Sequence, residues 1–216
     1  MMYKWQKLAK FEESGVVAVV RKIDPLIVHD VIDALVEGGI KILEITVDSD
    51  NSYDTIAKAK KRYDSSILVG AGTVLDKETA KTAIDANADF IFSPVYDAEM
   101  IQITNRYGKI SIPGVYTPSE ILQAYSYGAD ILKVFPATSL GPKYFKDVGG
   151  PLGHIPLMPT GGVNLDNMGE FVQNGAVAVG IGSALFDKES LANRDYAKVA
   201  AIAKQYSDKF IEVKQR

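Results

Sequence analysis

The 216-residue sequence contains no cysteine, and this absence removes several chemistries at once. Without thiols the chain can form no disulfide, offer no thiolate nucleophile and ligate no metal through sulfur. The two histidines, His29 and His154, are too few and too far apart in the sequence to indicate a zinc or iron site. We therefore expect neither a metal nor another cofactor.

A strong charge imbalance and a long apolar run are also missing. The 24 basic and 27 acidic side chains leave a net charge of −3, which gives no electrostatic reason to expect nucleic acid or an anionic membrane as a partner. No uncharged apolar stretch is long enough to span a bilayer, and residues 1–7 lack the apolar core of a signal peptide. These features predict a soluble cytoplasmic protein.

Short apolar segments recur along the chain at intervals of roughly 20–25 residues, about the length of one strand, one helix and two loops. Between them lie helical patterns, such as Val28, Val31 and Leu35 on one face. Eight such units predict parallel strands with right-handed crossovers, and eight is the number that closes a (β/α)8 TIM barrel. The eight apolar segments are residues 16–20, 40–46, 67–70, 90–93, 110–113, 131–135, 155–158 and 177–181.

An open, doubly wound α/β sheet is the competing architecture. A dinucleotide-binding sheet of that kind carries a glycine fingerprint after its first strand, where this chain has Arg21, Lys22 and Ile23. With 47% hydrophobic residues and no linker-like segment, the chain has the composition of one globular unit. We therefore predict one α/β domain over residues 1–216, folded as a single (β/α)8 barrel.

Two flanking segments add to this barrel. Trp5, Leu8 and Phe11 have helical spacing, which predicts an extra N-terminal helix within residues 1–14 that caps the barrel floor. Residues 188–216 are expected to form a C-terminal helix with small and aromatic side chains facing inward.

Two charged residues lie inside apolar strands. Lys133 stands within residues 131–136, where loss of water lowers the pKa of the amine and leaves a nucleophile able to form a Schiff base with a carbonyl. Glu44 shares one face of its strand with Ile42 and Thr46. An inward lysine and carboxylate could act as nucleophile and base. The alternative is a structural buried ion pair.

Further candidates stand at the C-terminal ends of the predicted strands, where barrel enzymes place their active sites. Glycine-rich loops follow the last two strands, and glycine lets backbone N–H groups approach an anion. We therefore predict a phosphate cradle, with ordinary turns as the alternative. Its residues are Gly161, Gly162, Gly182 and Ser183. The substrate-binding candidates at the other strand ends are Arg21, Thr46, Thr73, Pro94, Phe135 and Thr160.

With these residues placed, the sequence from about residue 15 to about residue 186 resembles the 2-keto-3-deoxy-6-phosphogluconate (KDPG) aldolase family, which includes the 2-keto-4-hydroxyglutarate (KHG) aldolases. The matching stretches are residues 39–46, 69–74, 92–94, 112–115, 133–137 and 159–163. The resemblance implies a metal-independent class I aldolase and a homotrimer. It implies a phosphorylated 2-keto acid as substrate, cleaved to pyruvate and glyceraldehyde 3-phosphate, or KHG cleaved to pyruvate and glyoxylate.

The resemblance also implies roles for single residues. Lys133 matches the family's Schiff-base lysine and Glu44 its acid/base. Thr73 matches a carboxylate contact, Pro94 and Phe135 match apolar contacts to the pyruvyl group, and Gly161, Gly162 and Ser183 match the phosphate cradle.

One segment departs from the family pattern. Many members carry an arginine shortly after the strand-two glutamate, whereas this chain reads Val47, Asp48, Ser49 and Asp50. Arg21 is the best substitute for that cation. Three alternatives stay open: an aldolase for the galactonate isomer, a sugar-phosphate epimerase or isomerase on the same barrel, and a phosphate-binding protein without chemistry.

Overall fold

The computed structural model describes residues 3–215 as one α/β domain, so Met1, Met2 and Arg216 of the two predicted flanking segments lie outside it. The strands are β1 Val16–Val20, β2 Ile42–Thr46, β3 Leu68–Gly72, β4 Phe90–Phe92, β5 Ile110–Ile112, β6 Gly114–Val115, β7 Leu132–Val134, β8 Leu157–Pro159 and β9 Val179–Ile181. The helices are α1 Lys4–Ser14, α2 Val28–Glu37, α3 Ser52–Tyr63, α4 Lys77–Asp85, α5 Ala98–Arg106, α6 Pro118–Ser126, α7 Gly141–Leu152, α8 Met168–Gln173, α9 Lys188–Ala192 and α10 Tyr196–Lys214. Short 3₁₀ turns, η1 Ala137–Ser139 and η2 Ser183–Leu185, follow β7 and β9.

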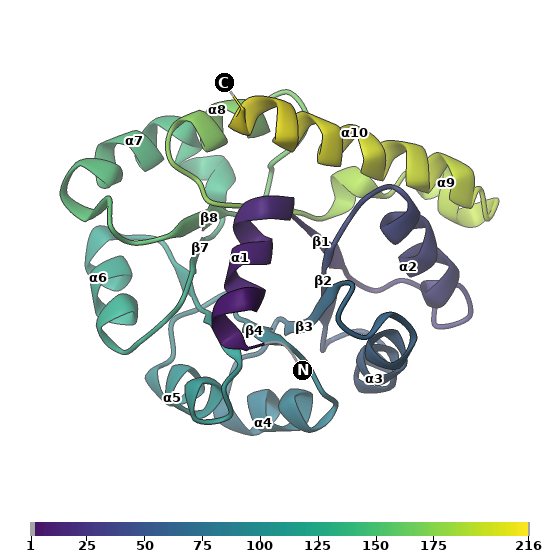
Figure 1. Ribbon diagram of the computed structural model, residues 1–216, viewed down its shortest axis with the longest axis horizontal. Helices are drawn as coiled ribbons and strands as arrows, with labels where there is room; N and C mark the ends of the chain where they lie inside the picture. Colours follow the sequence, from purple (N-terminus) through teal and green to yellow (C-terminus); the bar gives the residue numbers. More distant parts are fainter. Residues whose placement is uncertain (1–2, 216) are drawn as a thin grey trace.

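Every strand pair is parallel, as the alternation of strands and helices predicts. Six strands form a sheet in the order β5-β4-β3-β2-β1-β9, and three form a second sheet in the order β6-β7-β8. Each of the eight predicted segments contains a strand, and the fifth ends at Pro113, which separates β5 from a further short strand, β6. Figure 1 shows the helices arranged around these strands. Together the two sheets form one curled layer of strands, with helices on its outer side.

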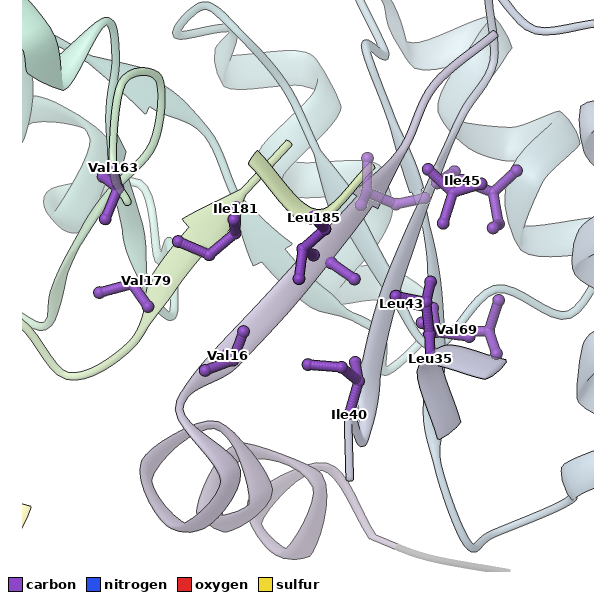
Figure 2. Close-up of a cluster of buried hydrophobic side chains, with 14 of the residues drawn as sticks. Val16, Leu35, Ile40, Leu43, Ile45, Val69, Val163, Val179, Ile181 and Leu185 are labelled. Atoms are coloured by element: carbon purple, nitrogen blue, oxygen red, sulfur yellow. The ribbon is translucent and has the colours of Figure 1, made fainter. Parts of the chain in front are cut away.

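The strands are buried on both faces, and the two faces have separate cores. Outward-facing side chains pack under the helices. Figure 2 shows part of this cluster: Val16, Leu43, Ile45, Val69, Val179 and Ile181 of the strands, with Leu35 of α2 and Leu185 of η2. The alternate strand positions form the inner cluster, which contains Val17, Ile42, Leu68, Phe90, Phe92, Ile110, Ile112, Ile131, Met158 and Ala178. The period of two that places Ile42 inward also places Glu44 and Thr46 on that inner side.

Helix α1 covers the N-terminal ends of the strands, as predicted, and lies across the centre of the ring in Figure 1. Phe11 is fully buried in the inner cluster, edge-on to Phe90 with ring centroids 5.4 Å apart. Leu8 packs against the same cluster. The inward role expected for Trp5 is wrong, because its surface is 68% exposed. At about 100° per residue, Trp5 lies roughly 120° around the helix from Phe11, so it faces solvent.

Two ion pairs anchor α1 at this end of the domain. The Nζ of Lys7 lies 2.7 Å from Oδ1 of Asp89, a buried carboxylate whose other oxygen pairs with Lys60 of α3 at 2.6 Å. Lys4 pairs with Asp130 at 2.8 Å. The floor of the domain is therefore closed, which leaves the opposite ends of the strands for a binding site.

The single C-terminal helix expected over residues 188–216 is two helices, α9 and α10. Arg194 has a φ of 54°, in the left-handed region that ends a helix, and the Asp195 side chain caps α10 by accepting from the backbone N–H of Lys198. The inward-facing positions of α10 are as predicted, with Ala203 and Tyr206 buried. Within residues 3–215, no helix is both long enough and apolar enough to cross a membrane.

Candidate active site

A cavity of about 890 Å³ lies at the C-terminal ends of the strands, opposite α1. Strand ends, the loops that follow them, and the η2–α9 segment contribute its walls. Every site residue predicted from the sequence lines this one cavity: Arg21, Glu44, Thr46, Thr73, Pro94, Lys133, Phe135, Thr160, Gly161, Gly162, Gly182 and Ser183. Parallel strands bring these distant segments together because their carboxyl ends share one edge.

Lys133 is the buried amine of the site. It stands on β7, two residues after Ile131 of the inner cluster, and only 5% of its surface is exposed. Its Nζ lies 4.7 Å from the ring centroid of Phe92 and 4.9 Å from that of Phe135. Burial lowers the pKa of Lys133, and the nearby Arg21 lowers it further, although Glu44 opposes both. The environment therefore favours a neutral, nucleophilic amine.

Glu44 is the buried carboxylate of the site, 1% exposed on β2. Burial raises the pKa of Glu44 against the opposing charges of Lys133 and Arg21. The Oε2 atom of Glu44 is buried without a hydrogen-bond partner. Within the part of the chain that the structure describes, no ion pair of 4.0 Å or less joins Glu44 to Lys133. An orphaned carboxylate oxygen carries a desolvation cost that a structural ion pair would have removed. The arrangement is thus one of two buried groups held apart, each biased toward its neutral form.

The two glycine loops, which follow β8 and β9, also line the cavity. Gly161 and Gly162 have φ of 88° and 76°, in the left-handed region that favours glycine. Thr138 Oγ1 donates to the Gly161 carbonyl and Asn167 Nδ2 to the Gly162 carbonyl, each at 2.9 Å. Both carbonyls are therefore engaged by side chains, which fixes the orientation of these peptide units.

Thr160 directly follows β8 and lines the cavity beside Gly161. It is 6% exposed, its Oγ1 is buried without a hydrogen-bond partner, and its backbone bridges to Gly180 of β9. A Cβ at position 180 would overlap that hydroxyl, so the glycine makes room for it. Thr73, just after β3, has a φ of 57° and also lines the cavity.

Comparison with known proteins decides the family. The family model described as KDPG and KHG aldolase matches residues 8–202. The chain belongs to this family. The 2-dehydro-3-deoxy-phosphogluconate aldolase of Treponema pallidum (strain Nichols) is 32% identical over 173 residues, which cover 80% of this chain and 82% of that protein. The family and the aldehyde-lyase class predicted from the sequence are confirmed.

Two further relatives bear on substrate and chemistry. A Rhizobium meliloti (strain 1021) protein named probable 2-dehydro-3-deoxy-6-phosphogalactonate aldolase is 32% identical over 175 residues, covering 81% of this chain and 82% of that protein. The crystal structure of KDPG aldolase from Legionella pneumophila, with pyruvate captured at low pH as a covalent carbinolamine intermediate, has a TM-score of 0.85. It is 26% identical, covering 94% of this chain and 98% of that one.

Several residues of this aldolase cavity were not predicted from the sequence. They are Val19, Lys22, Ile23, Val163, Asn164, Ala184, Phe186, Lys188 and Leu191. Lys22 and Ile23 follow directly on Arg21, and that adjacency was an available signal. Lys188 and Leu191 had none, because the sequence read as the start of a terminal helix, whereas α9 lies against the cavity. Among the described residues, no group of three or more His, Cys, Asp or Glu side chains is placed to hold a metal ion.

Gly72 provides a test of how tightly Glu44 is held. It pairs with Thr46 across β2 and β3, and a Cβ at this position would overlap the Glu44 carboxylate. We expect Gly72→Ala to displace that carboxylate, lower kcat at least about tenfold and cost about 1–3 kcal/mol of stability. Steady-state kinetics and urea unfolding measure both effects.

Gly149→Ala is the matched control. Gly149 lies in α7, and a Cβ there meets nothing within 4 Å. Alanine is the better helix former, so this variant should keep full activity and gain up to about 1 kcal/mol. Unchanged kinetics in Gly72→Ala would show that the carboxylate can move without consequence.

Proposed function

We propose that the protein is a class I aldolase that cleaves a 2-keto-4-hydroxy acid through a Schiff base on Lys133. The observation that carries the proposal is a buried amine with a lowered pKa, in one cavity with a buried carboxylate that has no partner for Oε2. The covalent pyruvate adduct named for the Legionella pneumophila relative is the chemistry such an amine would perform.

In the proposed mechanism, the neutral amine of Lys133 adds to the C2 ketone, and loss of water from the carbinolamine gives an iminium. Glu44 accepts the proton of the C4 hydroxyl as the C3–C4 bond breaks and its electron pair moves into the iminium. An aldehyde leaves, and an enamine remains on Lys133. Protonation of the enamine at C3, followed by hydrolysis, releases pyruvate and restores the amine. Glu44 returns its proton to C3 of the enamine, and the hydrolysis consumes one water to balance the water lost earlier. Besides water, the steps use only Lys133 and Glu44, which both line the cavity.

The other candidate residues are assigned to different groups of the substrate. We assign the substrate carboxylate to Arg21 and Thr73, and the pyruvyl group to the apolar contacts of Pro94 and Phe135. Thr46 and Thr160 stand at strand ends beside these groups, where their hydroxyls can bind substrate oxygens. The unpartnered Thr160 Oγ1 supports this assignment, because a buried hydroxyl without a partner gains most from a bound ligand.

The distal phosphate of KDPG is assigned to Gly161, Gly162, Gly182 and Ser183. In KHG no phosphate is present, so the two substrates separate this subsite from the chemistry. We expect Ser183→Ala to lower kcat/KM about tenfold for KDPG and less than twofold for KHG. Equal losses on both substrates would remove Ser183 from the phosphate site. The phosphogalactonate isomer belongs in the same assay, because one relative is named for it.

Two structural details belong to this proposal. Two parallel bridges, from Leu157 to Ala176 and from Thr160 to Gly180, support closure of the strands into an eight-stranded barrel, as does the separation of β5 and β6 by the single residue Pro113. Exposed apolar side chains follow three neighbouring strand ends. These are Leu75 after β3, Val95 after β4 and Tyr116 after β6. Exposed apolar side chains at these positions support burial in the implied homotrimer, which light scattering in solution would measure.

The decisive experiment is borohydride reduction in the presence of pyruvate. We expect a stable adduct that peptide mass mapping places on Lys133, and we expect full turnover in a chelator. An adduct on another lysine, or none at all, would refute the Schiff-base assignment. Lys188, which also lines the cavity but is exposed where Lys133 is buried, is the internal comparison for the mapping.

A further inference from the structure

The loops after β1 and β2 are bound to each other beside the cavity. Arg21 donates from Nε and Nη2 to Oδ2 of Asp48, at 3.2 and 2.9 Å. The backbone N–H of Lys22 donates to Ser49 Oγ at 2.8 Å, and Ser49 Oγ lies 2.9 Å from Thr46 Oγ1. Lys22 Nζ is 3.7 Å from the same Asp48 oxygen. These contacts fix the β1 loop at Arg21 and Lys22, two of the cations that line the cavity.

The geometry of Arg21 shows which donors remain for a ligand. A guanidinium has five N–H groups arranged in a planar fork, and a carboxylate can bind either its Nε–Nη2 edge or its Nη1–Nη2 edge. Asp48 occupies the Nε–Nη2 edge through a single oxygen. The Nη1–Nη2 edge is left for a second anion, and Arg21 lines the cavity. The guanidinium is thus half-engaged by the protein and half-available.

The electrostatics of the loop pair extend to the reacting groups. The charge of Arg21 lowers the pKa of both Lys133 and Glu44, whereas Asp48 raises that of Glu44. Burial alone would raise the pKa of Asp48, but hydrogen bonds from Arg21 and Thr46 hold it below its ordinary value. Asp48 therefore stays ionised and keeps Arg21 paired throughout the neutral range.

We infer that Asp48 is a positioning residue: it holds the Arg21 guanidinium so that its free edge meets the carboxylate of the 2-keto acid. This inference rests on the proposed function and adds a residue to it. A cation supplied from the β1 loop needs an orienting partner, because the Arg21 side chain is 55% exposed and a free arginine loses much rotamer entropy when it binds. Asp48 removes that entropy before the substrate arrives.

Three variants test the inference through the pyruvate concentration that half-saturates borohydride trapping on Lys133. Asp48→Ala removes the acceptor, and Asp48→Asn keeps an acceptor oxygen without the charge. Asp50→Ala, in the same loop but outside the cavity lining, is the control. Trapping is measured at about 1 M salt, where the Debye length is about 3 Å and the loss of charge itself is screened.

We expect Asp48→Ala to raise the half-saturating concentration about five- to tenfold while the maximal trapping rate changes less than twofold. Asp48→Asn and Asp50→Ala should stay within about twofold of the parent. In an Arg21→Ala background, Asp48→Ala should have no further effect, because the residue acts through Arg21.

Equal values for Asp48→Ala and the parent would overturn the inference, as would losses that add to those of Arg21→Ala. A shift in Asp48→Ala that Asp48→Asn shares would assign the effect to charge and also reject positioning. If the parent protein shows no trapping at all, the proposed function fails instead, so the two failures are distinguishable.

Discussion

Replacing Lys133 with methionine is expected to abolish turnover and to stabilise the fold at the same time. Methionine matches the length of the lysine stem and suits the surrounding apolar strand, but it cannot form a Schiff base. We expect kcat to fall by more than about 10⁴-fold, the scale on which loss of a covalent nucleophile acts. Pyruvate-dependent trapping should disappear with it.

The gain in stability follows from the burial of the amine. A charge removed from water without a close partner costs free energy, and apolar replacement of such groups is often stabilising by about 1–4 kcal/mol. Loss of Lys133 also removes a charge that lowers the pKa of Glu44. Stability is therefore compared between Glu44→Gln and the double variant Glu44→Gln/Lys133→Met, in which the carboxylate is neutral throughout.

The sign of the pH dependence is fixed by the lowered pKa. Between that value and 10.5, the unfolded chain binds a proton that the folded chain has released, so stability rises with pH across this window. The advantage of the methionine variant should be largest below the folded pKa and should vanish as the pH approaches 10.5. Urea unfolding at a series of pH values measures it. A methionine variant that is less stable at every pH would mean that Lys133 serves the structure.

The predicted residues that meet at the centre of the cavity share one property, which is that each has a local chemical signal in the sequence. Lys133 and Glu44 are single charges in apolar strands, and Gly161 and Gly162 need a backbone conformation that glycine favours. Strand order then follows from the alternation of strands and helices, and it brings these residues to one edge of the sheet. Local pattern and chain connectivity were therefore sufficient to predict which residues meet in this cavity.

The wrong or missing predictions concern residues whose position depends on contacts between segments that are distant in the sequence. Helical spacing alone put Trp5 on the inner side of α1, but the rotation of the helix about its axis is set by Phe11 in the core and by the ion pairs of Lys7 and Lys4. The C-terminal segment breaks into α9 and α10, and Lys188 of α9 lines the cavity. The hydrophobic periodicity of the sequence did not indicate this break. From the sequence, Asp48 was noted only because its segment lacks the arginine that many family members carry. Its hydrogen bond to Arg21 could not be predicted, because the two residues lie 27 positions apart in different loops.

Glu44→Gln is expected to lower kcat by about 10²–10⁴-fold while trapping of pyruvate on Lys133 persists. The amide matches the carboxylate in size and can still lie beside Gly72, so packing changes little, but it cannot accept the C4 hydroxyl proton. Glu44→Asp, which keeps a carboxylate on a stem one methylene shorter, is the control and should retain more activity than the amide.

The pH profiles separate the two buried groups. Cleavage needs ionised Glu44, and its pKa is raised above 4.5, so activity should fall as the pH drops through that raised value. Protonation of Lys133 also inhibits at low pH, but it acts on trapping as well as on cleavage. In the parent, the acidic limb that belongs to Glu44 is therefore present in the pH profile of cleavage and absent from that of trapping. In Glu44→Gln this limb is absent from both profiles. If the amide variant keeps that limb, another group is the base, and the carboxylate on β2 only shapes the cavity.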